Sequence, residues 1–295
     1  MLDCLVIGAG PAGLAAALYL RRYHRAIRVV SLADSRALKI DCSRNVPGFP
    51  DGISGRSLLQ RLQQQLAVFD GDVQEGAVTA LRREGAGGFV AEAGAERIVA
   101  RTVLLATGVE DIEPALPGAD ALSRDGRLRQ CPICDGHEHS GQRIAVLGRG
   151  DHGAREALFL RRFSERVVLF DQEPADPVSE ARRQQLAAAG IACVAAKPSA
   201  AEVGAAGQVR LALADGAVHE VDVVYAALGS RPRNELARAL GATLDERGNV
   251  VTDAHLRSSV PGLYAAGDIV SALDQIAVAH GHAAIAATAI HNSLD

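Results

Sequence analysis

The chain has 295 residues, a net charge of −4 and an isoelectric point near 6.1, so neither nucleic acid nor an anionic membrane surface is indicated as a partner. Hydrophobic residues form 48% of the sequence and charged residues 22%, a balance typical of globular cores, and the length suggests about two domains. The cysteine count is odd, at five, which favours a reducing compartment over a secreted disulfide framework. Without a signal-like leader or a membrane-spanning run, we expect a cytoplasmic protein.

The first predicted element is a buried parallel strand over Leu2 to Ile7. A glycine loop follows, with Gly8, Gly10 and Gly13 in the spacing G-x-G-x-x-G, and then a helical run from Leu14 to Tyr23. Such a loop lets backbone N–H groups approach a pyrophosphate, and the helix N-terminus adds partial positive charge. Alone this motif is weak, but the strand before it and the helix after it predict a dinucleotide site.

The second strand is predicted from Ile27 to Leu32, where nucleotide-binding units usually end in an acid that binds the ribose. Ser31 stands near that point, and its hydroxyl can still make one hydrogen bond. A helix is expected next, over residues 57–69. It is followed by a small meander with strands over 73–81, 88–93 and 96–100, and then by a buried strand over 103–108.

Cys131 and Cys134 are separated by two residues, and Asp135 follows the second cysteine directly. This spacing lets the sulfurs close and reopen a small disulfide ring, and it tends to lower one thiol pKa. The alternative is half of a zinc site, which would need two more ligands. His137 and His139 lie nearby, but a second Cys-x-x-Cys is absent from the sequence, so we favour redox chemistry with no metal.

The first pattern then repeats, which indicates a second Rossmann-like unit. A strand over residues 143–147 leads into a glycine loop with Gly148, Gly150 and Gly153, and a helix over 154–163 follows. The remaining elements expected in this repeat are strands over 167–170, 209–213, 218–221 and 223–228 and a helix over 181–189.

A strand-like run over residues 258–266 ends at Gly267 and Asp268, and a helix is expected from Gln275 to His291. An acid at a strand end can accept a hydrogen bond from a polyol hydroxyl, although Asp268 could equally be a helix N-cap. Cys4 and Cys193 fall in predicted strands, where free cysteine is commonly buried and structural.

Together these motifs resemble the bacterial, low-molecular-weight thioredoxin reductase family of flavoproteins over essentially the whole chain. The resemblance rests on the loop from Gly8 to Gly13, Asn45 with Pro47-Gly48, Ala106-Thr107-Gly108, the segment Cys131 to Gly136, the second glycine loop and the run Val260 to Asp268. It implies an α/β fold of two Rossmann-like three-layer domains, the second inserted into the first. The expected boundaries are 1–112 plus 241–295 for an FAD-binding domain and 113–240 for a nucleotide-like domain carrying the cysteine pair.

The resemblance also implies residue roles. Cys134 would exchange electrons with FAD, Cys131 would attack the substrate disulfide, and Asp135 would be the general acid. The residues that the resemblance implies for FAD binding are Gly8, Gly10, Pro11, Ala12, Gly13, Ser31, Asn45, Val73, Thr107, Gly108, Gly267, Asp268, Gln275, Ile276 and Ala277. The expected partner is a thioredoxin-like protein or a small dithiol or disulfide, and the family is usually a homodimer.

The sequence departs from the family in the segment that would bind the electron donor. Members that use NADPH carry arginines after the second strand of the middle domain, where this chain has Asp171, Glu173 and Asp176. These acids would repel a 2′-phosphate, so NADPH is an unfavourable donor. Asp171 could instead accept a hydrogen bond from the 2′-hydroxyl of NADH.

Three functions remain open from the sequence. The first is a thioredoxin-reductase-like enzyme reduced by NADH or by another donor, such as reduced ferredoxin or flavin. The second is a dithiol oxidase that passes electrons to oxygen, with His280 or His282 accepting thiol protons; packing or surface roles are the ordinary alternative for these histidines. The third is a flavin redox sensor without turnover, against which the intact cysteine pair and Asp135 argue.

Overall fold

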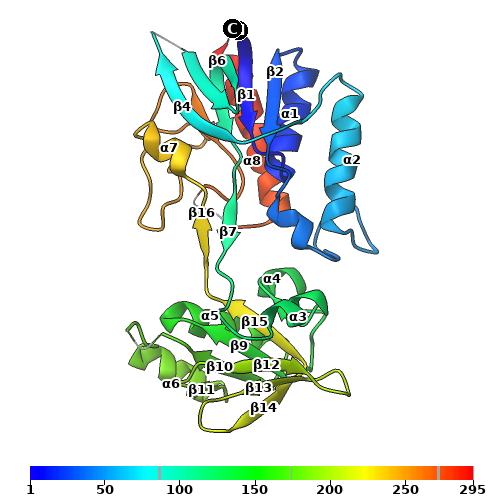
Figure 1. Cartoon of the computed structure of the whole chain (residues 1–295), viewed down its shortest axis with the longest axis vertical. Coiled ribbons are helices and arrows are strands. Elements are labelled where there is room, and N and C mark those ends of the chain that lie inside the picture. Colours follow the sequence, from blue (N-terminus) through cyan, green and yellow to red (C-terminus); the bar gives the residue numbers. More distant parts are fainter. Residues whose placement is uncertain (86–87, 174, 271–272, 295) are drawn as a thin grey trace. The chain divides into compact units, whose positions relative to one another are not determined.

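The computed structural model describes residues 1–85, 88–173, 175–270 and 273–294. The chain divides into two compact units, one formed by Met1–Glu110 and Arg231–Asp295 and the other by Asp111–Ser230 (Figure 1). The two chain crossings between the units pair with each other as β7 (Val109–Asp111) and β16 (Ser230–Pro232). Among the described residues, none of the helices combines the length and the apolar character needed to cross a membrane.

The first unit is built on a seven-stranded sheet. Its strand order is β3-β2-β1-β6-β5-β4, and β17 also pairs with β6. The strands are β1 (Leu2–Ile7), β2 (Ile27–Ser31), β3 (Gln74–Glu75), β4 (Val78–Glu84), β5 (Gly88–Ala93), β6 (Glu96–Leu105) and β17 (Leu263–Ala265).

β6 is one ten-residue strand, although the sequence predicted two separate strands in this region. Its first half pairs antiparallel with β5, and its second half pairs in parallel with β17, while β1 runs along its other edge. The apolar residues Val103 to Leu105 therefore belong to the same strand as the polar start at Glu96. Of the strand-like run predicted over 258–266, only β17 pairs with β6 in the sheet.

Two helices with many alanines pack together beside this sheet, α1 (Pro11–Arg22) and α8 (Ile276–Ser293). Small side chains such as Ala16 and Ala283, both fully buried, let the two helix backbones approach closely. The unit also contains η1 (Arg36–Lys39), α2 (Gly55–Ala67) and α7 (Glu235–Ala239).

The second unit repeats the parallel topology on a five-stranded sheet of order β11-β10-β9-β15-β8. These strands are β8 (Leu128–Arg129), β9 (Ile144–Gly148), β10 (Val167–Asp171), β11 (Ala192–Val194) and β15 (Val223–Ala227). A three-stranded antiparallel sheet accompanies it, formed by β12 (Ala200–Val203), β13 (Val209–Ala212) and β14 (Val218–Val221). Its helices are α3 (Ala119–Arg124), α4 (Pro132–Asp135), α5 (Gly150–Leu160) and α6 (Glu180–Ala188).

The return crossing into the first unit falls at Ser230/Arg231, ten residues before the predicted boundary at 240. The cause is α7, where Ala237 is fully buried and belongs to the hydrophobic core of the first unit together with Ala242. The five-residue helix is too short for its periodicity to assign it to either core from sequence.

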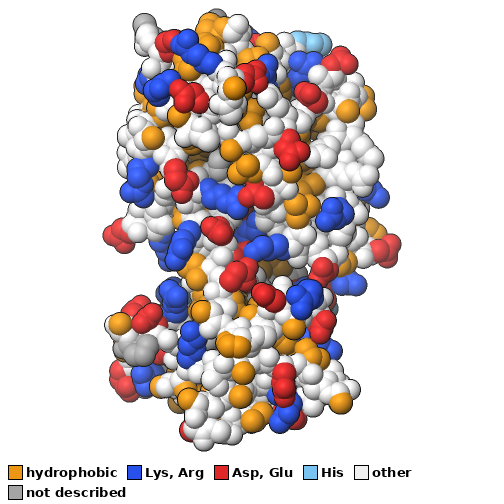
Figure 2. All heavy atoms as spheres, in the orientation of Figure 1, with side chains coloured by type: hydrophobic (Ala, Val, Ile, Leu, Met, Phe, Trp, Pro, Cys, Tyr) orange, Lys and Arg blue, Asp and Glu red, His pale blue; other side chains and the backbone are white. Residues whose placement is uncertain are grey.

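In both units the parallel strands bring their carboxyl ends to one edge of the sheet. Ile7 pairs with both Val30 and Leu105 in the first unit, and Gly148 pairs with both Asp171 and Ala227 in the second. The glycine loops leave the sheet at these edges, which is where open α/β sheets bind ligands. On the face drawn in Figure 2, acidic and basic side chains are interspersed.

Candidate functional site: a cysteine pair and two glycine loops

The cysteine pair sits at the start of the short helix α4. Cys131 is the N-cap, with an extended backbone, and Pro132 occupies the first helical position, where its missing N–H costs nothing. The structure joins Cys131 and Cys134 in a disulfide with Cα atoms 5.3 Å apart. The Cys134 N–H also donates to the Cys131 carbonyl at 3.0 Å, so backbone and sulfurs close the same tight turn.

Asp135, the residue after the pair, is buried and bound on both carboxylate oxygens. Arg129 Nε donates to Asp135 Oδ2 at 2.6 Å, and the Tyr225 hydroxyl donates to Asp135 Oδ1 at 2.7 Å. Tyr225 is fully buried on β15, and burial, reinforced by the charge of Asp135, raises the pKa of its hydroxyl. The tyrosine therefore stays protonated and remains a donor to the carboxylate.

Of the two histidines that follow the pair, His139 packs beside Tyr225. The His139 ring lies edge-on to Tyr225, with ring centroids 5.9 Å apart, and its Nδ1 is 2.9 Å from Gln142 Oε1. Within the described part of the chain, no group of three or more His, Cys, Asp or Glu could hold a metal ion.

In the first glycine loop, backbone atoms occupy the space that side chains would need. A Cβ on Gly8 would lie 2.3 Å from the Ala106 carbonyl oxygen, and one on Gly13 would lie 1.9 Å from the Gly8 carbonyl oxygen. Gly10 is the N-cap of α1, with Pro11 at the first helical position; among the described residues no side chain caps this end, and the first turn contains no acid. The N-terminus of α1 is thus left as a backbone site for an anion.

Other residues predicted to bind FAD are brought together in the same unit. Asn45 Nδ2 donates to Gln275 Oε1 at 2.8 Å across 230 residues of sequence. Ile276 and Ala277 follow in the first turn of α8, which has no acid and no capping side chain among the described residues. Gly267 approaches α1 so closely that a Cβ there would lie 2.9 Å from the Cβ of Ala12.

The remaining predicted residues lie around these loops. Thr107 donates its hydroxyl to the Arg233 carbonyl at 2.7 Å, and Gly108, with φ +67°, accepts from the Arg233 N–H. Ser31 ends β2, where its hydroxyl accepts from the Ala33 N–H at 3.3 Å. Val73 is half-buried against the main core just before β3.

Sequence reasoning missed Arg36, which pairs with the predicted residue Asp268. Arg36 Nη1 lies 3.1 Å from Asp268 Oδ2 and 3.3 Å from Asp274 Oδ2. The arginine is on η1, a 3₁₀ helix capped by the Ser35 side chain, and it meets Asp268 across 232 residues. An isolated basic residue in a turn-rich segment gives no sequence signal for such a pairing.

The second glycine loop has the expected close packing but a different environment. A Cβ on Gly148 would lie 2.6 Å from the Gly153 Cα, so strand β9 and helix α5 touch as a dinucleotide motif requires. However, α5 begins at Gly150, four residues earlier than predicted, and the N–H of Gly150 is already bound by the Asp171 side chain.

Asp171, the acid that could accept a ribose hydroxyl, is bound by backbone groups of its own unit. It is 7% exposed; its Oδ1 accepts from the Gly150 N–H at 3.2 Å, and its Oδ2 accepts from the Val178 N–H at 2.9 Å. Asp176 approaches Gly150 from another side, because a Cβ there would lie 2.7 Å from the Asp176 carbonyl oxygen. Asp151, in the first turn of α5, accepts from both the N–H and the hydroxyl of Ser179.

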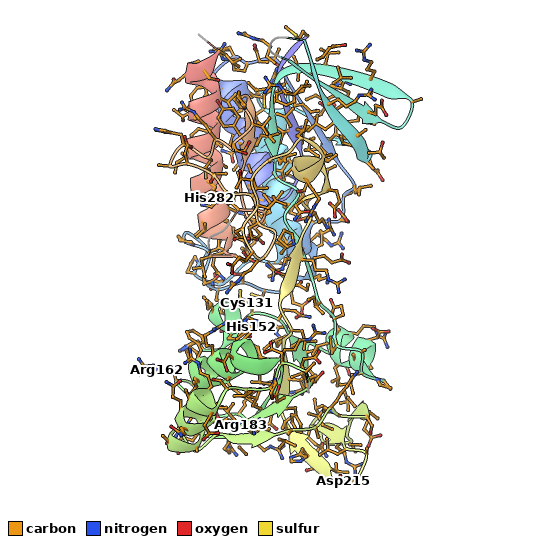
Figure 3. All side chains as sticks on the ribbon, turned by 90° about the vertical axis from the view of Figure 1, so that its left-hand side faces the viewer. Cys131, His152, Arg162, Arg183, Asp215 and His282 are labelled. Atoms are coloured by element: carbon orange, nitrogen blue, oxygen red, sulfur yellow. A yellow bond between two sulfur atoms is a disulfide. The ribbon has the colours of Figure 1, made fainter. Side chains whose placement is uncertain are left out.

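The two histidines predicted as proton acceptors are both on α8. His280 Nε2 is buried without a hydrogen-bond partner among the described residues, and burial lowers its pKa. Burial also lowers the pKa of His282, partly opposed by the charge of Asp268, and its Nδ1 accepts from the Gly267 N–H at 3.4 Å. His282, which is labelled on α8 in Figure 3, therefore lies against the Gly267-Asp268 motif.

Two of the other cysteines, Cys4 and Cys193, are held in strands. Cys4 is fully buried in β1, and burial raises the pKa of its thiol to about 12. Cys193 is on β11, and burial raises its pKa as well. Neither thiol has the lowered pKa of a reactive cysteine.

A disulfide in a Cys-x-x-Cys turn, carried on one Rossmann-like unit of a chain whose other unit has an uncapped glycine loop, defines a disulfide oxidoreductase with a dinucleotide cofactor. Comparison with known proteins agrees. Residues 2–283 match the family model described as pyridine nucleotide-disulphide oxidoreductase.

Individual relatives are thioredoxin reductases. The chain is 31% identical to that of Mycolicibacterium smegmatis, over 91% of this chain and 88% of the relative. It is 28% identical to that of Bacillus subtilis, over 99% and 95% of the two chains. The crystal structure of thioredoxin reductase from Streptococcus pyogenes superposes with a TM-score of 0.91 at 26% identity, covering 100% of this chain and 98% of that one.

The chain belongs to the pyridine nucleotide-disulphide oxidoreductase family, and within it to the thioredoxin reductase type. It is accordingly an FAD-dependent oxidoreductase that acts on sulfur groups, with two Rossmann-like domains and a redox-active disulfide. The first glycine loop fits FAD, because Gly8 and Gly13 leave no room for side chains there and the α1 N-terminus is open to a pyrophosphate.

Proposed function

We propose that this protein moves electron pairs between FAD and the Cys131–Cys134 disulfide, and between that pair and an external dithiol or disulfide, without a nicotinamide dinucleotide as donor. FAD would be held by the first glycine loop, Asn45, Gln275 and the Gly267-Asp268 motif, and it would supply the two-electron chemistry. Cys131, the N-cap of α4, is proposed to exchange with the substrate, and Cys134 with the flavin.

The contrast between the two glycine loops carries the proposal on the donor. At α1 the first turn has no acid, whereas at α5 the Asp171 carboxylate already accepts the Gly150 N–H. Asp151 and Asp176 also lie at the α5 N-terminus, so a dinucleotide pyrophosphate would meet three carboxylates. This supports exclusion of NADPH, and it counts against NADH too, because both oxygens of Asp171 are already bound.

The proposed substrate is a thioredoxin-like protein or a small molecule with a dithiol or disulfide. The relatives are named thioredoxin reductases, which supports the protein substrate. The exposure of Ile133 between the two cysteines supports access by either kind of substrate. A homodimer and a cytoplasmic location stay predictions from the family resemblance and the sequence.

A dithiol oxidase that passes electrons to oxygen is the second candidate, and one observation favours it. His282 contacts the backbone of Gly267 in the proposed FAD site, and burial lowers the pKa of its imidazole. A neutral imidazole there can accept a proton that a dithiol releases on oxidation.

An anaerobic titration of the flavin absorbance tests the proposal. We expect dithiothreitol to bleach the flavin and near-stoichiometric NADH or NADPH to leave it oxidised. Bleaching by either nucleotide at such amounts would contradict the exclusion of dinucleotides. If dithionite alone bleaches the flavin, the cysteine pair is not its electron route.

The same bleached sample separates the two candidate functions. Rapid recovery of the flavin colour on admission of air supports the oxidase. Recovery under anaerobic conditions on addition of oxidised thioredoxin, with slow recovery in air, supports the reductase.

A further inference from the structure

A cavity of about 530 Å³ lies at the end of α1 that is remote from the first glycine loop. α1 begins beside Gly10 and ends at Arg22, so its length of about 17 Å separates the cavity from the proposed FAD site. The turns that follow α1 and α2 form its walls, and these two helices lie side by side (Figure 1). The volume is within the range of small-ligand sites, and the proposed redox function makes no use of it.

The walls of this cavity carry more positive than negative charge. They hold one acid, Asp70, and three arginines, Arg21, Arg22 and Arg25. Arg25 is bound to α8, because its Nε and Nη2 donate to the ring Nδ1 and the carbonyl of His291, at 2.9 Å each. Arg21 and Arg22 form no ion pair with an acid among the described residues. Their charge is therefore available to an anion from solution.

Phe69 holds these two arginines in different ways. Arg21 Nε donates to the Phe69 carbonyl at 2.9 Å, which leaves the terminal nitrogens of the guanidinium as a fork that matches a phosphate. The guanidinium carbon of Arg22 lies over the Phe69 ring, 5.3 Å from its centroid, in a cation–π contact. A guanidinium that is stacked on one face can stack with the planar ring of a ligand on the other.

The turns around the cavity place side chains where helix ends usually have glycine. In both turns the closing N–H, of Arg25 after α1 and of Gly71 after α2, donates to a carbonyl of the last helical turn, at 3.0 and 3.2 Å. His24 and Asp70 hold the left-handed positions, with φ of 58° and 55°. Both residue types tolerate this conformation less well than glycine does. The two strained side chains line the same cavity.

Stabilisation of the helix dipole does not account for this arrangement. Cations suit the C-terminus of a helix, and Arg21 and Arg22 stand in the last turn of α1. That role requires neither a third arginine on the same cavity nor two strained side chains from different turns. Cations, a stacking surface and a hydrogen-bond acceptor on one cavity are the groups that a phosphate ester with a polar ring needs.

We propose that this cavity binds a small organic phosphate with a planar ring, of the size of a nucleoside monophosphate. The fork of Arg21 binds the phosphate together with His24, and the ring stacks on the Arg22 guanidinium. Asp70 accepts hydrogen bonds from hydroxyl or amino groups of the ligand. All of these residues belong to the first unit, so the site is independent of the proposed redox function and is a second ligand site of the FAD-loaded protein.

Isothermal titration calorimetry of the FAD-loaded protein with AMP tests the site, with the flavin absorbance recorded to verify that FAD stays bound. We expect a single class of AMP site with a dissociation constant of about 10–100 μM. Adenosine, which lacks the phosphate, and inorganic phosphate, which lacks the ring, should each bind at least about tenfold more weakly. The affinity for AMP should also fall as the salt concentration rises.

Arg22→Gln should weaken AMP binding about tenfold, because the ligand loses a cation and its stacking surface together. Arg83→Gln is the matched control. Arg83 also lies over a phenylalanine of the first unit, 5.7 Å from the centroid of Phe89, but it does not line the cavity. The control should bind AMP within about twofold of wild type.

His24→Gly separates a binding role from a structural one. Glycine adopts the left-handed conformation without strain, so the urea midpoint of the variant should not fall. AMP binding should nevertheless weaken about threefold or more, because the imidazole donor is lost. This variant also keeps the proposal testable if Arg22→Gln does not fold.

Four results would overturn the proposal. The first is the absence of AMP binding to the wild type at about 1 mM, and the second is adenosine bound as tightly as AMP. The third is an equal loss in Arg22→Gln and Arg83→Gln, which would assign the binding to the net charge of the unit. The fourth is release of flavin as AMP binds, which would place AMP in the FAD site.

Discussion

The Tyr225 hydroxyl donates to Asp135 across 2.7 Å, joining the fully buried centre of β15 to the helix that carries the disulfide. The two residues are 90 positions apart in the sequence. Because Arg129 binds the other oxygen, the carboxylate next to Cys134 has a fixed orientation. The position of the cysteine pair on its unit thus depends on two side chains that have no redox chemistry of their own.

Tyr225→Phe should weaken this attachment while leaving the FAD-binding unit unchanged. We expect the free energy of unfolding to fall by about 1–2 kcal/mol, because a buried carboxylate loses one of two donors. Urea unfolding, read separately from flavin content, measures the effect. Tyr19→Phe, at a half-exposed position on α1, is the matched control and should change the midpoint little. An equal loss in both variants would contradict the predicted contribution of the bond.

Gly13→Ala should abolish FAD binding. The added Cβ would lie 1.9 Å from the Gly8 carbonyl oxygen, so the loop must open at the point where the pyrophosphate is expected. The flavin-to-protein absorbance ratio after purification measures the loss. Gly281→Ala on α8 is the control, because no described atom lies within 4 Å of the Cβ it would add. That variant should keep its flavin, and retention of full flavin by Gly13→Ala would contradict the assigned site.

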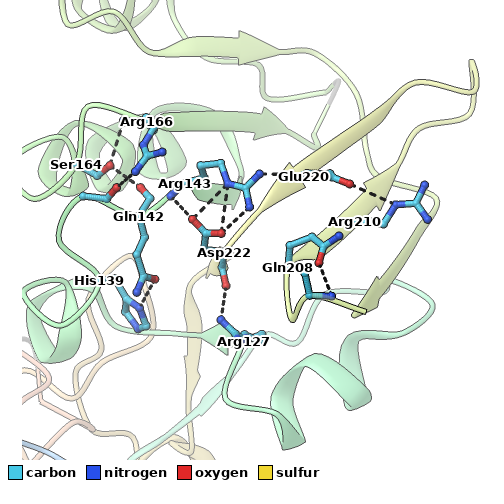
Figure 4. A network of polar contacts seen from close by, with 12 residues as sticks. Arg127, His139, Gln142, Arg143, Ser164, Arg166, Gln208, Arg210, Glu220 and Asp222 are labelled. Atoms are coloured by element: carbon cyan, nitrogen blue, oxygen red, sulfur yellow. Dashed lines mark hydrogen bonds and ion pairs between the residues drawn. The ribbon is translucent and has the colours of Figure 1, made fainter. Parts of the chain in front are cut away.

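Asp222 and Arg143 connect the starts of β15 and β9, and their bond should give the second unit a pH-dependent stability. Asp222 accepts from the Arg143 N–H at 2.8 Å and from its guanidinium at 2.6 Å (Figure 4). These hydrogen bonds lower the pKa of Asp222, so its contribution is present above the usual carboxyl pKa and is lost as pH falls through the lowered value.

Asp222→Asn should therefore cost about 1 kcal/mol near neutral pH and much less near pH 3. Urea midpoints at the two pH values measure the difference. Glu220→Gln is the control, since Glu220 is exposed and lies 3.8 Å from Arg143, and it should cost little at either pH. A loss for Asp222→Asn that is independent of pH would argue for a packing effect instead.

Glu156 should have the opposite pH dependence. Burial raises its pKa from 4.5 to about 7, so its contribution to stability is fully present below about pH 4.5 and declines until the pH passes 7. Glu156→Gln cannot ionise, so its stability relative to wild type should rise by on the order of 2–3 kcal/mol between these limits. Urea midpoints at about pH 4.5 and pH 8 test this, and a constant difference between the variants would contradict the raised pKa.

Much of the fold could be predicted from the sequence because its signals are local. The loops at Gly8 and Gly148 each stand between a short apolar strand and a helix, and the structure has those elements there. The chain repeats this pattern, which predicted two Rossmann-like units. The limits of α5 were less accurate, because Arg149 and Asp151 obscure a helix that begins within the loop.

The site was less predictable, because its contacts join distant residues. The pairing of Arg36 with Asp268 and that of Tyr225 with Asp135 depend on which strand ends meet, and neither Arg36 nor Tyr225 stands in a motif. Asp171 was recognised as the acid at a strand end. Its hydrogen bonds to Gly150 and Val178 depend on how the following segment returns to α5, which periodicity does not encode.

In the proposed function, electrons reach the flavin through the Cys131–Cys134 pair. The most direct measurement compares anaerobic bleaching of the flavin by dithiothreitol in the wild type and in Cys134→Ser, with equal flavin content verified beforehand. We expect the wild-type flavin to bleach and the Cys134→Ser flavin to stay oxidised, although dithionite still bleaches it. Bleaching of Cys134→Ser by dithiothreitol at the wild-type rate would contradict electron transfer through the cysteine pair.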